Sequence, residues 1–201
     1  KVMSLGGDFH VKPVQVTDKI RNIGKADLII IGVKAWQIKD IARELKEIIH
    51  PETLVLPLQN GILAADELMT EINRHHIIGG MCRIISKIEA PGIINHFGVE
   101  PAILIGELDN LKTERIQGIK DLLEESGIHT RIPDDIHAEI WKKFINICVS
   151  GLLAITRSTY GEIRELPETR QLMHALLLEI YLISQKAEIK IENEFVDKTM
   201  D

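Results

Sequence analysis

This sequence of 201 residues has few cysteines, no long hydrophobic run and no cluster of basic residues. Its two cysteines, Cys82 and Cys148, match no metal-ligand spacing, so we expect two reduced, buried thiols in a cytoplasmic protein and no metal site. No run reaches the ~20 apolar residues of a membrane helix, and the first ten residues lack the apolar core of a signal peptide. A net charge of −6 and a pI near 5.8 argue against nucleic acid or an anionic membrane as the main partner. An ordinary soluble globular protein is therefore expected.

The glycine-rich turn of a dinucleotide-binding fold is missing as well. The pattern GxGxxG occurs nowhere, and the doublets Gly6-Gly7 and Gly79-Gly80 lack the third glycine and open no helix. The chain also begins without methionine, on a strand-like KVMSL, as if cut from a longer sequence. Taken alone, it does not form a complete nucleotide-binding domain.

The first half alternates strand-like and helix-like segments. Short apolar runs at 12–16, 27–33 and 53–61 predict strands, and residues 36–49 and 62–72 have the apolar spacing of amphipathic helices. This order predicts a parallel α/β sheet.

Two changes of pattern follow. Residues 77–107 offer strand candidates at 77–86, 92–98 and 102–107 without a helix between them, then a helix at 113–127 and a last strand at 128–133. Beyond Pro133 everything reads as helix.

The helical part is expected to open with a long helix capped by Asp134 or Asp135, and Pro167 opens a second one that extends to residue 191. The predicted fold class is thus α/β: a partial Rossmann-like parallel sheet with a β-rich extension, followed by an all-α domain. We expect a nucleotide-binding domain at 1–134, incomplete at its N-terminus, and a helical substrate and catalytic domain at 135–201, incomplete at its C-terminus.

Two polar residues follow the expected parallel strands. Lys34 comes after 27–33, and Asn60 with Gly61 ends the next strand. Ligands of open parallel sheets bind outside the carboxyl ends of the strands, where a lysine can meet a phosphate or ribose and an amide can both donate and accept. The alternatives are a solvated lysine and a turn asparagine.

The segment EIWKKFINICVSG, residues 139–151, places polar residues inside an apolar run. At 100° per residue one face is apolar and expected to pack, comprising Trp141, Phe144, Ile145, Cys148 and Leu152. The opposite face carries Lys143, Asn146 and Ser150, flanked by Ile147 and Leu153. This polar stripe is either the wall of a cleft or a solvent-facing surface.

In the second interpretation Glu139 and Lys143 form an i,i+4 pair worth only ~0.3 to 0.5 kcal/mol. Lys142 lies off the stripe and is not a candidate for the site.

Six motifs occur in the order of one known family across most of the chain: VKAWQ (33–37), LPLQNGI (56–62), GIINHFG (92–98), ILIGE (103–107), IWKKF (140–144) and LLAITRSTYGEIR (152–164). In these motifs the chain resembles the ketopantoate reductase family (2-dehydropantoate 2-reductase). The resemblance implies a Rossmann domain, a helical domain and an active site between them. It also implies NADPH-dependent reduction of 2-dehydropantoate to pantoate on the route to pantothenate and coenzyme A.

The resemblance also implies roles for individual residues. Lys34 would contact the cofactor, Asn60 would sit where cofactor and substrate meet, Lys143 would be the catalytic lysine and Trp141 its packing anchor. A small-molecule 2-keto acid is the implied partner. Hydride delivery builds negative charge on the ketone oxygen, which a positioned ammonium can stabilise and then protonate.

The chain departs from the family at two substrate-binding positions. The family's asparagines four and eight residues after the lysine correspond here to Ile147 and Gly151, whereas Asn146 and Ser150 lie three and seven residues after it. Asn146 and Ser150 could substitute as substrate-binding residues, and another 2-keto acid stays open. The family's later serine and glutamate would lie beyond Asp201.

Two further hypotheses stay open from the sequence. One is a dehydrogenase of the hydroxyisobutyrate or 6-phosphogluconate type. The other is a non-catalytic remnant that associates through its long helices, in which a row of apolar residues forms either core or the interface of a homodimer: Leu172, Leu176, Ile180 and Ile183. A stable dimer in sedimentation without NADPH binding would favour the remnant.

Overall fold

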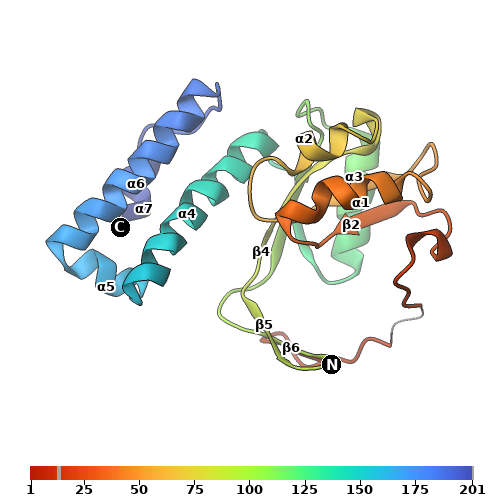
Figure 1. Cartoon of the computed structure of the whole chain (residues 1–201), viewed down its shortest axis with the longest axis horizontal. Helices are drawn as coiled ribbons and strands as arrows, with labels where there is room; N and C mark the ends of the chain where they lie inside the picture. Colours follow the sequence, from red (N-terminus) through yellow and green to blue (C-terminus); the bar gives the residue numbers. More distant parts are fainter. Residues whose placement is uncertain (13–14, 201) are drawn as a thin grey trace. The chain divides into compact units, whose positions relative to one another are not determined.

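The computed structural model describes residues 1–12 and 15–200, and the chain separates into two compact units (Figure 1). The first comprises residues 1–59 and 63–136 and is α/β, whereas the second comprises residues 60–62 and 137–201 and is helical. The predicted fold class is therefore confirmed. The strand expected at 12–16 includes residues 13 and 14, which lie outside the described residues.

The elements of the first unit are, in chain order, β1 (Val2–Met3), η1 (Ile20–Asn22), β2 (Leu28–Ile31), η2 (Ala35–Gln37), α1 (Ile38–Leu45), β3 (Leu54–Pro57), α2 (Ala64–Met69), η3 (Arg74–His76), β4 (Gly79–Arg83), β5 (Ser86–Ala90), β6 (Ile93–His96), β7 (Ala102–Gly106), α3 (Glu114–Glu125) and β8 (His129–Arg131). Those of the second are α4 (Ile136–Thr156), which starts at the last residue of the first unit, α5 (Tyr160–Glu165), α6 (Pro167–Lys186) and α7 (Phe195–Met200).

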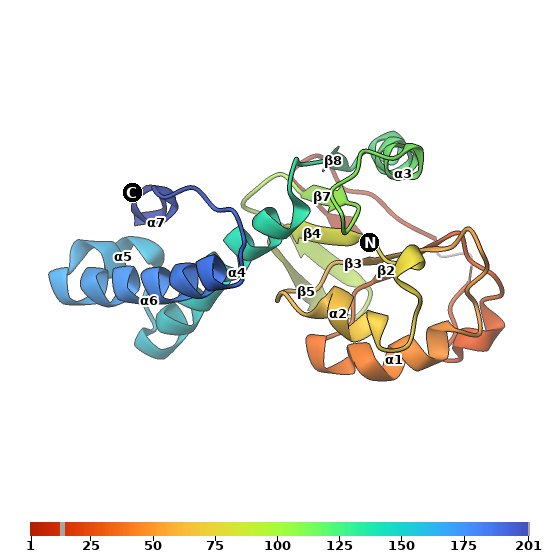
Figure 2. The same cartoon turned by 90° about the horizontal axis from the view of Figure 1, so that it is seen from above.

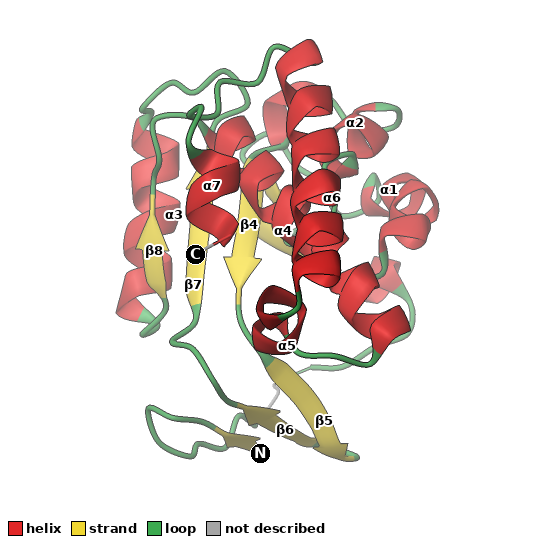
Figure 3. Ribbon diagram, turned by 90° about the vertical axis from the view of Figure 1, so that its left-hand side faces the viewer, coloured by secondary structure: helices red, strands yellow, loops and turns green. Residues whose placement is uncertain are grey.

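The strands β2, β3, β4, β7 and β8 follow one another across the first unit. β2 and β3 are parallel, and a parallel bridge from Val55 to Ile77 connects β3 to the segment that leads into β4. β7 then pairs antiparallel with β4 and parallel with β8, and Figure 3 shows these three strands side by side. The predicted parallel sheet with a β-rich extension is thus present.

Helices cover both faces of β3. Val55 packs in one cluster with residues of α1 and α2, whereas Leu54 and Leu56 pack in another with residues of α3. Figure 2 shows α1 and α2 on one side of the strands and α3 on the other. Because both faces are covered, all four residues of β3 are buried, which explains its continuous apolar sequence.

A second, smaller sheet has the order β1-β6-β5. The single strand expected at 77–86 is wrong in its second half. β4 ends at Arg83, and β5 begins at Ser86 and pairs antiparallel with β6 in the smaller sheet. Most of β5 is exposed, so its sequence lacks the apolar pattern of a buried strand.

The start of α4 is fixed by a pair of glycines. Gly79 of β4 and Gly106 of β7 lie opposite each other in the register, and Ile136 packs against both. A Cβ at Gly79 would lie 2.8 Å from Ile136 Cγ1, and one at Gly106 would lie 2.9 Å from Ile136 Cβ. The Ile136 N–H donates to Asn110 Oδ1 at 2.9 Å. The glycine pair therefore makes the notch that holds the first residue of α4.

α6 begins at Pro167 as predicted but ends at Lys186, five residues before the expected end. Glu188 adopts the left-handed conformation with φ 59°, and the Ile189 N–H donates to the Ser184 carbonyl at 3.0 Å. This is the Schellman ending, which usually has glycine where this chain has glutamate. The sequence therefore gave no signal for it. Among the described residues, no helix is both long and apolar enough to cross a membrane.

The core of the helical unit differs from the face predicted for α4. Ile145, Val149 and Leu152 are buried there, together with Met173 and Leu177 of α6. The buried face of α4 is therefore centred on Val149. Three residues of the predicted packed face are only half-buried, namely Trp141, Phe144 and Cys148.

The residues that the sequence analysis singled out as core or interface differ in burial. Trp141 packs against the core and makes an edge-to-face contact with Phe144, with ring centroids 5.8 Å apart. On α6, Leu176 and Ile180 pack against the core as well, whereas Leu172 and Ile183 are about half exposed. Among the described residues, neither Cys82 nor Cys148 forms a disulfide, and both are half-buried rather than buried.

Candidate functional site

The carboxyl ends of β2 and β3 lie at the same edge of the sheet. Ile31 and Pro57 are register partners at the ends of the two strands, and the Leu58 N–H donates to the Ile31 carbonyl at 3.1 Å. The segments that carry Lys34 and Asn60 leave the sheet from this edge. Open parallel sheets bind their ligands at such an edge.

Lys34 is exposed and lies in extended conformation immediately before η2. Its backbone N–H donates to Gln37 Oε1 at 3.0 Å, so the side chain of Gln37 fixes the turn that carries the lysine. An exposed ammonium at this edge is suited to a phosphate or ribose. The contact of Lys34 with a cofactor stays a prediction.

The loop after β3 contains a second group that sequence reading missed. Gln59 lies directly before Asn60, and both atoms of its amide group, Oε1 and Nε2, are buried without a hydrogen-bond partner among the described residues. Asn60 itself is exposed, and Gly61 follows in a conformation with φ 110° that favours glycine. The sequence feature that could have indicated this group is a glutamine that directly follows a continuously apolar stretch.

The two neighbouring lysines of α4 have different surroundings. Lys142 Nζ lies 3.1 Å from Glu139 Oε1 and 3.0 Å from Glu192 Oε2. Burial acts to lower the pKa of Lys142, but its hydrogen bonds to Glu192 and Glu139 outweigh burial and raise the pKa. Lys142 thus ties α4 to the segment after α6, consistent with its exclusion from the candidate site. Lys143 is half-buried.

Asn146 and Ser150 are both exposed on α4, and Tyr160 brings them together. The Tyr160 hydroxyl donates to the Asn146 carbonyl at 3.2 Å and lies 3.3 Å from Ser150 Oγ. The Arg164 guanidinium lies 6.0 Å from the centre of the tyrosine ring.

Tyr160 is the first residue of α5, and a capping box formed by Thr159 and Glu162 fixes its position. Sequence reading did not single out Tyr160, because its partners lie ten or more positions earlier in the chain.

The structure divides the predicted site residues between the two units. Lys143, Asn146 and Ser150 belong to the helical unit, and so does Asn60, because residues Asn60–Ile62 group with that unit. Lys34 belongs to the α/β unit. Within the helical unit, direct contacts connect Asn146 and Ser150 through Tyr160.

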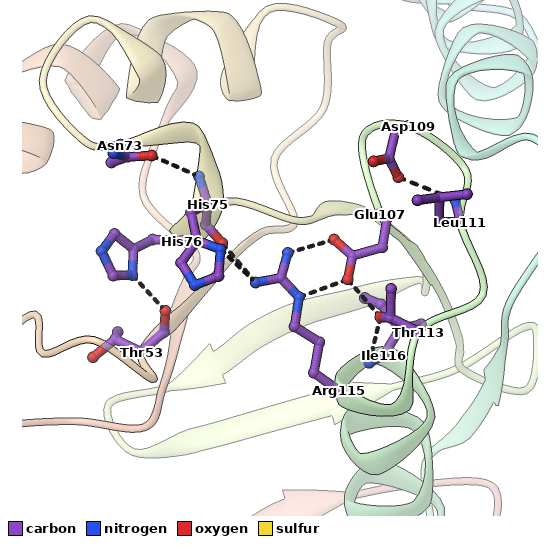
Figure 4. A network of polar contacts seen from close by, with 10 residues as sticks. All are labelled: Thr53, Asn73, His75, His76, Glu107, Asp109, Leu111, Thr113, Arg115 and Ile116. Atoms are coloured by element: carbon purple, nitrogen blue, oxygen red, sulfur yellow. Dashed lines mark hydrogen bonds and ion pairs between the residues drawn. The ribbon is translucent and has the colours of Figure 1, made fainter.

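A separate polar network, shown in Figure 4, is centred on the buried carboxylate of Glu107. Arg115 donates to both of its oxygens at 2.6 Å, and the Thr113 hydroxyl donates to Oε1 at 2.6 Å. Arg115 also donates to the His75 carbonyl at 2.7 Å.

Burial acts to raise the pKa of Glu107, but the hydrogen bonds from Arg115 and Thr113 outweigh it and lower the pKa. Glu107 follows β7, which runs antiparallel to β4, so this network lies at the opposite edge of the sheet from Lys34 and Gln59. The donors and acceptors of this network are hydrogen-bonded to one another. We therefore assign the network a structural role.

Comparison with known proteins identifies two family matches. Residues 1–110 match the model of "Ketopantoate reductase PanE/ApbA", and residues 135–201 match that of "Ketopantoate reductase PanE/ApbA C terminal". The 2-dehydropantoate 2-reductase of Nostoc sp. is 27% identical over 206 residues, which cover 100% of this chain and 64% of that enzyme. The chain spans only 54% to 64% of the length of the curated relatives it matches.

Solved structures of similar fold include a 2-dehydropantoate 2-reductase and a D-mandelate dehydrogenase. The 2-dehydropantoate 2-reductase of Geobacter metallireducens has a TM-score of 0.90 and 27% identity, covering 99% of this chain and 67% of that one. A D-mandelate dehydrogenase in complex with NADH has a TM-score of 0.77 and 25% identity, covering 86% of this chain and 58% of that one.

Proposed function

Because this chain belongs to the ketopantoate reductase family, we propose that it forms part of an enzyme that reduces 2-dehydropantoate to pantoate with NADPH, on the route to pantothenate and coenzyme A. The observation that carries the proposal is the match of both parts of the chain to the two family models. Lys34, Asn60 and Lys143 stand in the motifs through which the chain resembles the family.

The residues at the carboxyl edge of β2 and β3 fit a nicotinamide dinucleotide. An exposed lysine, an exposed amide and a buried amide that has no partner among the residues described follow the two strands: Lys34, Asn60 and Gln59. Lys34 would hold a phosphate or ribose hydroxyl, and Asn60 would orient cofactor and substrate. When bound, the cofactor supplies the hydride for the reduction.

Lys143 would act on the oxygen of the substrate's ketone. As the carbonyl carbon gains a hydride, its oxygen becomes negative, and the ammonium of Lys143 stabilises this charge and donates a proton to it. The product is a 2-hydroxy acid, and solvent restores the proton on Lys143. Trp141, which packs against the helical core, would fix this part of α4.

Asn146 and Ser150 would bind the substrate's carboxylate or hydroxyl groups. Their side chains can donate hydrogen bonds without adding a charge that competes with Lys143. Tyr160 contacts the backbone carbonyl of Asn146 and the hydroxyl of Ser150, so it would fix the Ser150 side chain and the helix backbone at Asn146.

The test compares two neighbouring lysines in the full-length protein. We expect Lys143→Ala to lower kcat by about 10²- to 10⁴-fold, because a proton donor in the transition state contributes this much. The matched control is Lys142→Ala, which breaks the ion pairs to Glu139 and Glu192 and should lower the melting temperature while kcat stays within about two-fold. Near-normal turnover of Lys143→Ala would overturn the assignment.

A second candidate function is reduction of another 2-keto acid by the same chemistry. The family's asparagine positions are Ile147 and Gly151 in this chain, and a D-mandelate dehydrogenase shares the fold. Steady-state kinetics with ketopantoate and phenylglyoxylate, each with NADPH and NADH, separates the candidates. A higher kcat/KM for ketopantoate with NADPH supports the first function.

The remaining expectations from the sequence belong to the same proposal. A cytoplasmic location follows from the role of the enzyme in biosynthesis and would be checked by cell fractionation. A homodimer stays a prediction for sedimentation velocity of the full-length protein.

A further inference from the structure

The amide of Gln59 is a polar group at the candidate site whose chemistry the proposed roles leave unused. Both Oε1 and Nε2 are buried and have no hydrogen-bond partner among the described residues. Buried polar groups in folded proteins nearly always have a partner, and an exception requires an explanation. Gln59 also lies at the carboxyl end of β3, the edge of a parallel sheet that binds ligands.

The strand that leads into Gln59 is tightly packed. All four residues of β3 are buried, and the Leu58 N–H is bonded to the Ile31 carbonyl at 3.1 Å. On the neighbouring strand, Gly80 approaches so closely that a Cβ there would lie 2.9 Å from the Pro57 carbonyl oxygen. A side chain that closely follows such a strand is suited to positioning a ligand, because the strand before it is packed on both faces.

The unpaired donor and the unpaired acceptor of the Gln59 amide determine which chemical groups can bind there. Nε2 needs an acceptor and Oε1 needs a donor. A ketone or carboxylate offers acceptors only and would leave Oε1 unpaired, whereas a primary carboxamide offers one donor and one acceptor in the same plane. We propose that Gln59 binds the carboxamide of the nicotinamide ring through a pair of hydrogen bonds and so orients the ring; this rests on the proposed function.

The test exploits the opposite effects that this role predicts on stability and on binding. In the full-length protein, Gln59→Met replaces the unpaired amide with an apolar side chain of similar length. Without cofactor the variant should melt a few degrees higher, about 2 to 4 °C, because a buried polar group without a partner is removed. Its Kd for NADPH should rise about 10- to 100-fold, because two hydrogen bonds are lost.

A cofactor analogue makes the test specific to the carboxamide. The reduced 3-acetylpyridine analogue of the dinucleotide has a methyl group where the carboxamide has its NH₂ group. Wild-type protein should bind the analogue more weakly than NADPH, and Gln59→Met should bind the two alike. Binding is measured by fluorescence titration, independently of turnover. Gln117→Met, on the exposed surface of α3, is the control and should change neither quantity.

Two outcomes would overturn the role of Gln59. One is an unchanged Kd for NADPH in Gln59→Met. The other is equal discrimination against the analogue by wild type and variant, which would assign the amide to an ordered water instead. Failure of the proposed function is a different result: wild-type protein that binds NADPH as described but reduces no 2-keto acid.

Discussion

At the scale of single residues, Glu107 shows how a buried charge is accommodated. Its residue is 5% exposed, and Arg115 and Thr113 occupy both carboxylate oxygens. Burying a carboxylate is unfavourable unless it is paired and hydrogen-bonded, and this one is both. The network therefore stabilises the fold only while Glu107 is ionised.

We expect Glu107→Gln to lower the free energy of unfolding at neutral pH by about 1 to 3 kcal/mol, because the amide nitrogen that replaces one carboxylate oxygen cannot accept a hydrogen bond from Arg115. Urea titrations of wild type and variant measure the difference. Glu89→Gln is the control, because Glu89 is an exposed carboxylate of β5 and its loss should have no measurable effect.

The contribution of Glu107 also depends on pH. The pKa of Glu107 is lower in the folded protein than the unfolded value of about 4.3. Its stabilisation is therefore complete above that unfolded value and is lost as the pH falls through it toward the folded pKa. The difference between wild type and Glu107→Gln should shrink on acidification, and a difference that is constant with pH would contradict this account.

At the scale of elements, the contact of α4 with the sheet depends on two residues without side chains. Gly79 and Gly106 are opposite each other on β4 and β7, and Ile136 fills the space that their missing Cβ atoms leave. This arrangement fixes where the long helix begins. The position of Lys143 and Asn146 along α4 follows from that starting point.

Gly79→Ala should destabilise the protein by about 1 to 3 kcal/mol, because the new Cβ would lie 2.8 Å from Ile136 Cγ1 in a packed interior. Thermal or urea unfolding measures the change. Gly118→Ala is the control, because no atom lies within 4 Å of its Cβ position on α3, and alanine should stabilise the helix by up to about 1 kcal/mol.

The clash between the new methyl group of Gly79→Ala and Ile136 can also be relieved by shortening Ile136. Combining Gly79→Ala with Ile136→Ala should cost less than the sum of the two single changes, since the smaller side chain leaves room for the new methyl group. If the two changes in the free energy of unfolding are strictly additive, close packing against Ile136 is not the reason that position 79 is a glycine.

At the scale of the whole molecule, the two compact units have separate cores. The helical core contains Met173 and Leu177 with residues of α4 and α7, and the α/β unit has a cluster on each face of β3. None of these three clusters of described residues mixes residues of the two units. Substitutions in one core should therefore act first on their own unit.

We expect Met173→Ala, at a position that is 0% exposed, to cost about 2 to 5 kcal/mol through lost contacts and a cavity. In hydrogen-exchange mass spectrometry, amides of α4 and α6 should lose protection while those of β3 and β7 keep theirs. Equal loss of protection in both units would contradict the separation of the cores.

The amino-acid sequence by itself determined the order of the elements and the division into an α/β and a helical part, because the period of apolar residues is a local property. It also separated Lys143 from Lys142, since helical geometry places them on different faces. The family motifs predicted roles for Lys34 and Asn60. These inferences required no knowledge of which distant segments meet.

Only the tertiary structure decided which side chains have partners. The burial of the Gln59 amide, the contacts of Tyr160 with Asn146 and Ser150, and the pairing of Lys142 with Glu192 connect residues through the packing of separate segments. The same packing centred the buried stripe of α4 on Val149 and ended α6 at Lys186. The physical reason is that a side chain's partner depends on how whole elements pack, and local sequence patterns do not encode that packing.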